Sequence, residues 1–226
     1  MCFETIDATQ VKSKDEVFDI MGKYYGNEHY RAAIRLGWTK KELFVLKGLL
    51  DEINDLGYYF SNLHKLSYIA DLRFVPILLE YYDIIDNKDA ILDALHHKEY
   101  FKYTPAVLEL YNNTTSSELR FGISSALFAM RSRKYIDYYL ETVNRPDYIG
   151  NDMISVILCK YHVKEFSNRF IDLYNMNPKA VSWNMAHYGY LLGDRKMLPI
   201  LEALEKSTTK EISHSAKKSL EKLLLS

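Results

Sequence analysis

Two copies of a short motif indicate the fold of the last three quarters of the chain. Residues 66–78 read LSYIADLRFVPIL, and residues 190–201 read YLLGDRKMLPIL. In both copies an apolar stretch and a polar turn precede a proline. Proline is tolerated in the first turn of a helix, because the amide hydrogen that it lacks would have no intrahelical partner there. Each copy therefore predicts the turn that joins two consecutive helices.

The motif belongs to a repeat that can be aligned without gaps. Its anchor positions follow one another at separations of 29, 32, 31 and 31 residues: Pro76, Pro105, Asp137, Asn168 and Pro199. A fixed period of this length is typical of repeat proteins, in which one helical hairpin cannot cover both of its apolar faces and stacks on the next. We therefore predict five helical hairpins with a continuous core, and no β-sheet.

Three positions of the repeat predict this core. They lie two residues before, two residues after and ten residues before each anchor: Phe74, Tyr103, Tyr135, Phe166 and Met197; Leu78, Val107, Tyr139, Phe170 and Leu201; and Leu66, Leu95, Leu127, Leu158 and Gly189. Gly189 is the exception at the position ten before the anchor, and Lys98 is the exception at the position seven before it, which is otherwise apolar. An acid follows four of the five anchors by four residues. We expect the apolar positions to be buried and the acids to be solvated.

Several of these segments resemble a known family. Residues 66–78 and 190–201, together with Glu118-Leu119-Arg120 followed by Ala126-Leu127, resemble HEAT-like repeats of the short variety that phycobilisome lyases also contain. The resemblance covers roughly residues 58–226 and implies an all-α fold, an α/α superhelix (a HEAT-like solenoid) of stacked antiparallel helix hairpins. It also implies a binding scaffold, although the same fold carries enzymes.

Residues 1–57 are expected to form N-terminal capping helices that pack on the first repeat. A capping box at residues 13–16 predicts a helix that ends near Gly26, and a short helix is expected over residues 28–36. Thr39 can cap a third helix with an apolar stripe that runs to Leu56. At the other end, residues 211–225 predict a closing helix. Because no Gly-, Ser- or Pro-rich linker separates residues 1–57 from residues 58–226, we expect one continuous structural domain.

Composition and charge limit the partners that we expect. The chain of 226 residues holds 29 Lys and Arg against 30 Asp and Glu, and its formal net charge of −1 makes nucleic acid an unlikely partner. The two cysteines do not suggest a disulfide framework, and the sequence shows neither a signal peptide nor the apolar run of about 18 residues that a membrane span needs. We expect a cytoplasmic protein with no membrane partner.

The sequence contains no recognisable catalytic or ligand-binding motif. None of the seven histidines has a zinc-ligand spacing, and no glycine-rich phosphate loop is present. Cys159 has no identifiable base partner, so we interpret it as a half-buried structural residue rather than as a nucleophile. We therefore expect a protein that is not an enzyme and that binds neither metal nor cofactor.

The second helix of each hairpin is expected to line a concave surface, and its non-core positions are the candidate partner-binding residues. They lie sixteen or seventeen residues before the anchors, with one further residue a helical turn later: Tyr59, Arg120, Asn151, Asp152, Trp183 and His187. Arg, Trp and Tyr are enriched at binding hot spots. A buried Trp183 is an equal alternative. If Trp183 is exposed, charge reversal at Arg120 combined with Trp183→Ala should abolish partner binding and leave the stability of the chain nearly unchanged.

The sequence leaves three functions open, and the first of them, which needs no catalytic residues, agrees best with these observations. The first is a non-enzymatic protein-binding scaffold or regulator, which includes inhibitors and immunity-type neutralisers of another protein. The second is a nucleic-acid binding protein or a DNA-glycosylase-like enzyme, and the third is a chromophore lyase, each on a similar repeat fold.

The charge also changes along the chain, from net −5 in residues 1–113 to net +4 in residues 114–226. This difference is either ordinary solvated surface or a means of steering a charged protein partner.

Overall fold

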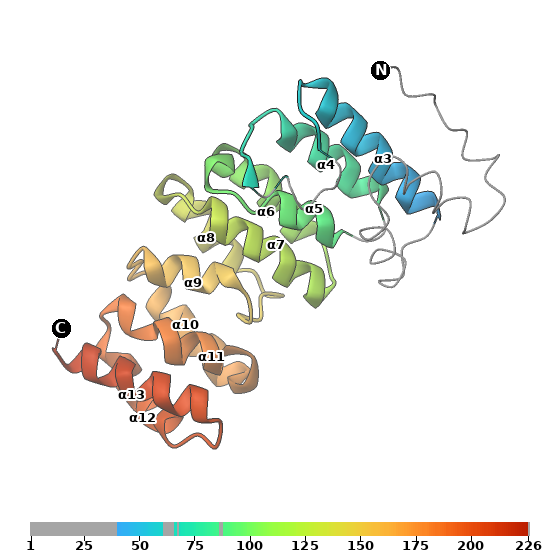
Figure 1. Ribbon diagram of the computed structural model, residues 1–226. Helices are drawn as coiled ribbons and strands as arrows, with labels where there is room; N and C mark the ends of the chain where they lie inside the picture. Colours follow the sequence, from blue (N-terminus) through green and yellow to red (C-terminus); the bar gives the residue numbers. More distant parts are fainter. Residues whose placement is uncertain (1–39, 61–65, 67, 86–87, 226) are drawn as a thin grey trace. The chain divides into compact units, whose positions relative to one another are not determined.

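The computed structural model describes residues 40–60, 66, 68–85 and 88–225, and this part of the chain consists of helices and connecting turns without a β-strand. Figure 1 labels the α-helices in chain order. Their bounds are α3 (Lys40–Asp55), α4 (Phe74–Ile84), α5 (Asp89–Ala94), α6 (Thr104–Asn113), α7 (Ser117–Met130), α8 (Ile136–Val143), α9 (Met153–Lys160), α10 (Phe166–Met176), α11 (Pro178–Tyr188), α12 (Leu198–Glu205) and α13 (Lys210–Leu225). Four 3₁₀ helices join them: η3 (Lys98–Tyr103), η4 (Arg133–Tyr135), η5 (Gly189–Leu192) and η6 (Arg195–Met197).

These elements confirm the all-α fold class, including the helix expected at residues 211–225. The helices expected over residues 13–26 and 28–36 lie outside the described residues. Among the described residues, no helix combines the length and the apolar character that crossing a membrane requires.

The chain divides into two compact units, Met1–Tyr100 and Phe101–Ser226. In the first unit α3 packs on α4, and α4 packs on α5. The apolar stripe of α3 is buried at Leu46, Leu49, Leu50 and Ile53. The boundary expected at residue 57 thus lies inside the first unit, which also contains the first repeat.

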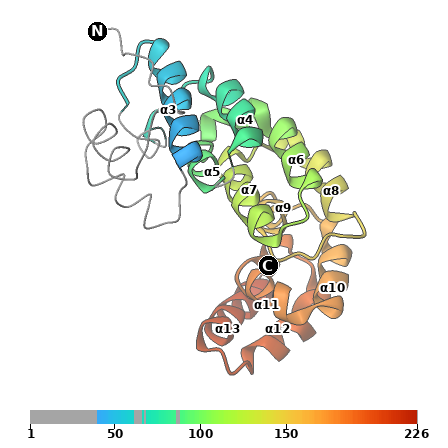
Figure 2. The ribbon, with the colours of Figure 1, turned by 90° about the vertical axis from the view of Figure 1, so that its right-hand side faces the viewer.

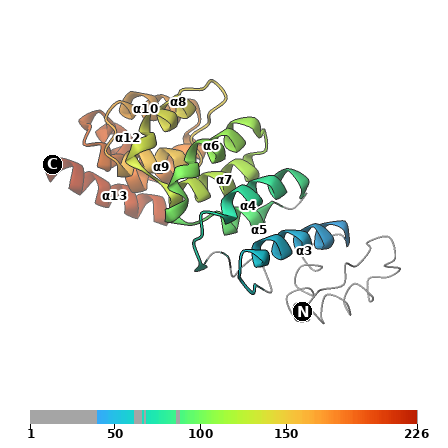
Figure 3. The ribbon, with the colours of Figure 1, turned by 90° about the horizontal axis from the view of Figure 1, so that it is seen from above.

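The second unit consists of four helical pairs. α6 packs on α7, α8 on α9, α10 on α11 and α12 on α13, while contacts between the pairs join α7 to α9, α9 to α11 and α11 to α13. Within this unit, Figures 2 and 3 show α6, α8 and α10 on one side and α7, α9 and α13 on the other. We call α6, α8, α10 and α12 the first helices, and we call α7, α9, α11 and α13 the second-helix layer.

The repeat positions occupy the predicted places in these helices. Every anchor lies in the first turn of its helix, from Pro76 in α4 to Pro199 in α12. The positions two after and ten before the anchor are buried in all five copies. The position two before it is buried except at Tyr103, which is half-buried, and the acids that follow the anchors are exposed, as predicted. The position seven before the anchor is less regular, because Ile69 and Lys98 are exposed.

Polar side chains fix where the second helices begin. The Ser116 hydroxyl accepts a hydrogen bond from the amide of Leu119 at the start of α7, at 3.3 Å. At the start of α11, the Asn177 side chain accepts from the amide of Ala180, at 3.4 Å. Such caps satisfy amide groups that have no intrahelical partner, and they set the register of the surface side chains that follow.

Candidate functional site

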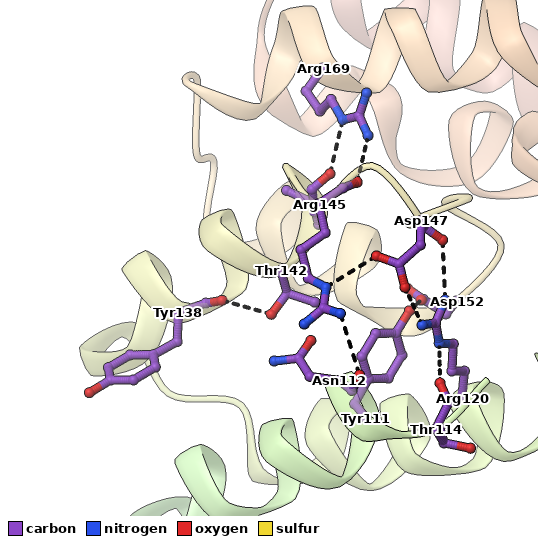
Figure 4. A network of polar contacts seen from close by, with 11 residues as sticks. Tyr111, Asn112, Thr114, Arg120, Tyr138, Thr142, Arg145, Asp147, Asp152 and Arg169 are labelled. Atoms are coloured by element: carbon purple, nitrogen blue, oxygen red, sulfur yellow. Dashed lines mark hydrogen bonds and ion pairs between the residues drawn. The ribbon is translucent and has the colours of Figure 1, made fainter. Parts of the chain in front are cut away.

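Arg120 holds a loop of the second unit in place. Its Nε donates to the carbonyl oxygen of Thr114 at 2.9 Å, and its guanidinium contacts both the carbonyl oxygen, at 3.1 Å, and the carboxylate of Asp147. Arg145 also donates from Nε to the Asp147 carboxylate, at 3.1 Å, as Figure 4 shows. Hydrogen bonds from these two arginines lower the pKa of Asp147. The loop at residues 144–152 is thereby tied to the end of α6.

This network changes the role that the sequence suggested for Arg120. Only 14% of its side chain is exposed, and its donors are used within the chain. Reversing its charge would therefore break the loop network, so we no longer expect such a variant to keep its stability. A partner would meet little of this side chain.

Asp152 lies in the core of the second unit, 1% exposed. Its carboxylate accepts hydrogen bonds from the hydroxyls of Tyr111 and Tyr148, the latter at 2.8 Å, and caps α9 by accepting from the amide of Ile154 at 2.9 Å. Burial raises the pKa of Asp152, while these donors oppose the rise. The side chain is a structural centre that a partner cannot reach, whereas its neighbour Asn151 is half-buried.

Trp183 and His187 lie together, with Trp183 exposed and His187 half-buried, so the structure favours the surface alternative for Trp183 over the buried one. The two rings stack with centroids 4.1 Å apart. The Trp183 indole, 39% exposed, donates to Glu211 on α13 at 3.1 Å, and His187 bonds through Nε2 to the hydroxyl of Ser215 at 2.9 Å. These contacts fix both rings between α11 and α13. Tyr59, at 97% exposure, belongs to the first unit and is not part of this group.

A row of cations and aromatic rings continues from Trp183 across the second-helix layer. The Trp183 ring meets Tyr188 edge-on at 5.9 Å. The Lys160 ammonium lies 5.7 Å from the centroid of Tyr188 and 5.1 Å from that of Phe128. Arg131 lies over the same Phe128 ring, at 4.6 Å. We call Arg131, Phe128, Lys160, Tyr188 and Trp183 the cation–aromatic row.

The two cations of the row have no acidic partner in the part of the chain that the structure describes. Neither Arg131 nor Lys160 forms an ion pair with a carboxylate of the described residues, and both are exposed. Their position at the C-terminal ends of α7 and α9 is favourable for positive charge, because the carbonyl groups there carry partial negative charge. The row is therefore a stable arrangement that leaves its charges available to a ligand.

Charge differs between the two layers of the second unit. The first helices carry six acidic residues against one basic residue: Glu109, Asp137, Glu141, Asp172, Glu202 and Glu205 against Arg169. The second-helix layer carries seven basic residues against three acidic ones: Arg120, Lys160, Lys179, Lys210, Lys217, Lys218 and Lys222 against Glu118, Glu211 and Glu221. The net positive charge of residues 114–226 is therefore unevenly distributed: the first helices are acidic and the second-helix layer is basic.

The sequence offered only a weak signal for this row. Phe128 directly follows the buried Leu127, Tyr188 directly precedes the buried Gly189, and Lys160 lies two residues after the buried Leu158. These three residues of the row therefore lie next to the position ten before the anchor. Their distances from that position differ, so they do not occupy one common position of the repeat.

Comparisons with models of protein families, with curated proteins and with solved structures find no match to this chain. Function must therefore be argued from the chemistry of the site. Cys159 is completely buried, and burial raises the pKa of its thiol. The thiol of Cys159 and the carboxylate of Asp152 are thus both removed from any substrate, whereas the cation–aromatic row is accessible.

Proposed function

We propose that this chain is a non-enzymatic protein-binding scaffold or regulator that contacts another protein through its second-helix layer. In this proposal the second unit is a short HEAT-like solenoid whose concave face is that layer. The observation that carries the proposal is the cation–aromatic row, in which two exposed cations, the exposed Trp183 ring and two half-buried rings contact one another across α7, α9 and α11.

The residue types of the row support binding to a protein. Trp, Tyr and Arg are the side chains most enriched among the residues that dominate the energy of protein interfaces. Trp183 is also held in place by its hydrogen bond to Glu211 and by its stacking on His187. A side chain that is already ordered loses less conformational entropy when a partner binds, so more of the contact energy contributes to affinity.

Three reactive groups of the second unit are used or enclosed by the fold, which supports a role without catalysis. The carboxylate of Asp152 and the thiol of Cys159 are both enclosed in the core. The Asp147 carboxylate is used to order a loop through Arg120 and Arg145. Each of these groups therefore has a structural role.

Site-specific photo-crosslinking in cells of the natural host tests the proposal. A benzophenone amino acid replaces Trp183 in the second-helix layer, and the matched control replaces Tyr138 on α8, an aromatic residue of similar exposure (39% and 49%). We expect a discrete protease-sensitive adduct from position 183 and none from position 138. Equal adducts from both positions, or no adduct from position 183, would contradict the proposed surface. A nuclease-sensitive adduct would favour a nucleic-acid binding protein instead.

A further inference from the structure

We propose that the partner presents an acidic polypeptide segment, whose carboxylates bind Arg131 and Lys160 and whose apolar side chains pack against Phe128 and Tyr188. This inference rests on the proposed function and specifies the chemistry of the partner. It is carried by the geometry of the two cations and by the distribution of charge between the layers.

Two positive charges gather around one ring. The Arg131 guanidinium and the Lys160 ammonium lie 4.6 and 5.1 Å from the centroid of Phe128. Arg131 also donates from Nη1 to the carbonyl oxygen of Phe128 at 2.7 Å, which fixes its position at the end of α7. Both charges of the same sign lie on one ring, and a carboxylate placed beside that ring would be attracted to each of them. The arrangement is thus complementary to an acidic side chain next to an apolar one.

The charge of the layer extends this complementarity beyond the row. The second-helix layer carries an excess of basic residues, including Lys179, Lys217 and Lys218, which are all exposed. An acidic segment would be attracted to this layer and repelled by the acidic first helices. Electrostatic complementarity of this kind increases the rate of association and fixes the orientation of the partner.

The same observations favour a polypeptide over a nucleic acid. Proteins that bind single strands use open aromatic faces on which bases stack. Here cations lie over the rings of Phe128 and Tyr188, and both rings are half-buried, so they offer a base no open face but leave part of each ring for a smaller aliphatic side chain. Carboxylates spaced among apolar side chains match the row better than a continuous polyanion does.

A pair of synthetic probes tests the inference on the full chain. The first probe is a fluorescein-labelled peptide of repeated Glu-Glu-Leu triplets, and the second has glutamine in place of every glutamate. Fluorescence anisotropy should show binding of the glutamate peptide only, and added salt should weaken it, since exposed charges are screened. Lys160→Glu should weaken binding about tenfold, because the reversal replaces an attraction by a repulsion. Lys160→Arg should retain it.

The controls separate the inference from a general effect of charge. Lys206→Glu makes the same change in net charge at an exposed residue outside the row, and it should bind the glutamate peptide like the unaltered chain. A circular dichroism melt of each variant confirms folding. Equal binding of the two peptides, or unchanged binding by a folded Lys160→Glu variant, would overturn the inference.

Two further outcomes would identify another occupant of the row. Tighter binding of a single-stranded oligonucleotide than of the glutamate peptide would replace the acidic segment by nucleic acid. Self-association in sedimentation analysis that Lys160→Glu abolishes would assign the row to the acidic first helices of a second copy. If the peptide fails while position 183 still crosslinks to a protein, the proposed function stands and only the acidic nature of the partner is rejected.

Discussion

Replacing Asp152 by alanine should strongly destabilise the second unit. The variant loses the cap of α9, which contributes about 1 kcal/mol. It also leaves the buried hydroxyls of Tyr111 and Tyr148 without their acceptor, at about 1–3 kcal/mol each. Because the burial cost of the carboxylate disappears at the same time, we expect a net loss of about 2–4 kcal/mol in the free energy of unfolding, which is smaller than the sum of these costs.

Urea unfolding followed by circular dichroism measures this loss, and a double-mutant cycle assigns it. Tyr111→Phe removes one of the two unsatisfied hydroxyls, so in combination with Asp152→Ala it should cost less than the two single changes together, by about 1–3 kcal/mol. Asp172→Ala, an exposed acid on α10, is the control and should change stability by less than about 0.5 kcal/mol. A loss below about 1 kcal/mol for Asp152→Ala, or additive single changes, would refute the reasoning, since buried groups left without partners carry these costs.

Three other predictions concern stability. Leu127→Ala and Leu158→Ala, at completely buried repeat positions, should each lower the free energy of unfolding by about 2–5 kcal/mol in urea titrations; unchanged stability in both would contradict the register of the repeat. Arg73 lowers the pKa of Asp71 from 3.8 to about 2, so the stability that this carboxylate contributes is complete above pH 3.8 and is lost as the pH falls towards 2. Asp71→Asn should therefore reduce the acid sensitivity of the chain between these values, as measured by fluorescence. Gly150→Ala should cost about 1–3 kcal/mol, because φ is +78° there and a Cβ would lie 3.2 Å from a valine methyl group, and an unchanged melting temperature would exclude this strain.

The repeat core could be predicted from sequence because its signals are local. A position two residues after an anchor lies in the same helix as the anchor, so its direction follows from helical geometry. Leu78 and Leu201 are therefore both buried although they belong to different units. The position ten before the anchor is predictable for a similar reason, since in the four copies from Leu95 to Gly189 it lies at or near the end of the preceding helix.

The starts of the second helices could not be predicted in the same way. Counting back from the anchors places Arg120 in the first turn of α7, Asp152 at the N-cap of α9 and Trp183 in the middle of α11. The three helices have 14, 8 and 11 residues, so one offset reaches a different depth in each. As a result, the same repeat position holds three different roles: Arg120 binds a loop, Asp152 is a buried helix cap and Trp183 is exposed at the surface.

The cation–aromatic row depends on contacts between helices that are remote in sequence. Phe128 and Lys160 meet only because α7 packs on α9, and Lys160 reaches Tyr188 only because α9 packs on α11. Neither contact leaves a spacing pattern in the chain. Interactions of this kind follow from the three-dimensional packing rather than from the periodicity of one helix.

Because α9 is buried in the folded chain, its apolar residues are exposed while the chain is still being synthesised. Six consecutive residues of this helix, Ile154–Cys159, are buried on all sides, and their sequence ISVILC is uncharged and rich in β-branched side chains. Such a run is prone to pair with other chains while it is exposed. It emerges from the ribosome before α10 and α11, which pack against it, have been made. Asp152 and Lys160 are the charged residues nearest to the run on either side, and chains that stop before α11 should aggregate rather than fold.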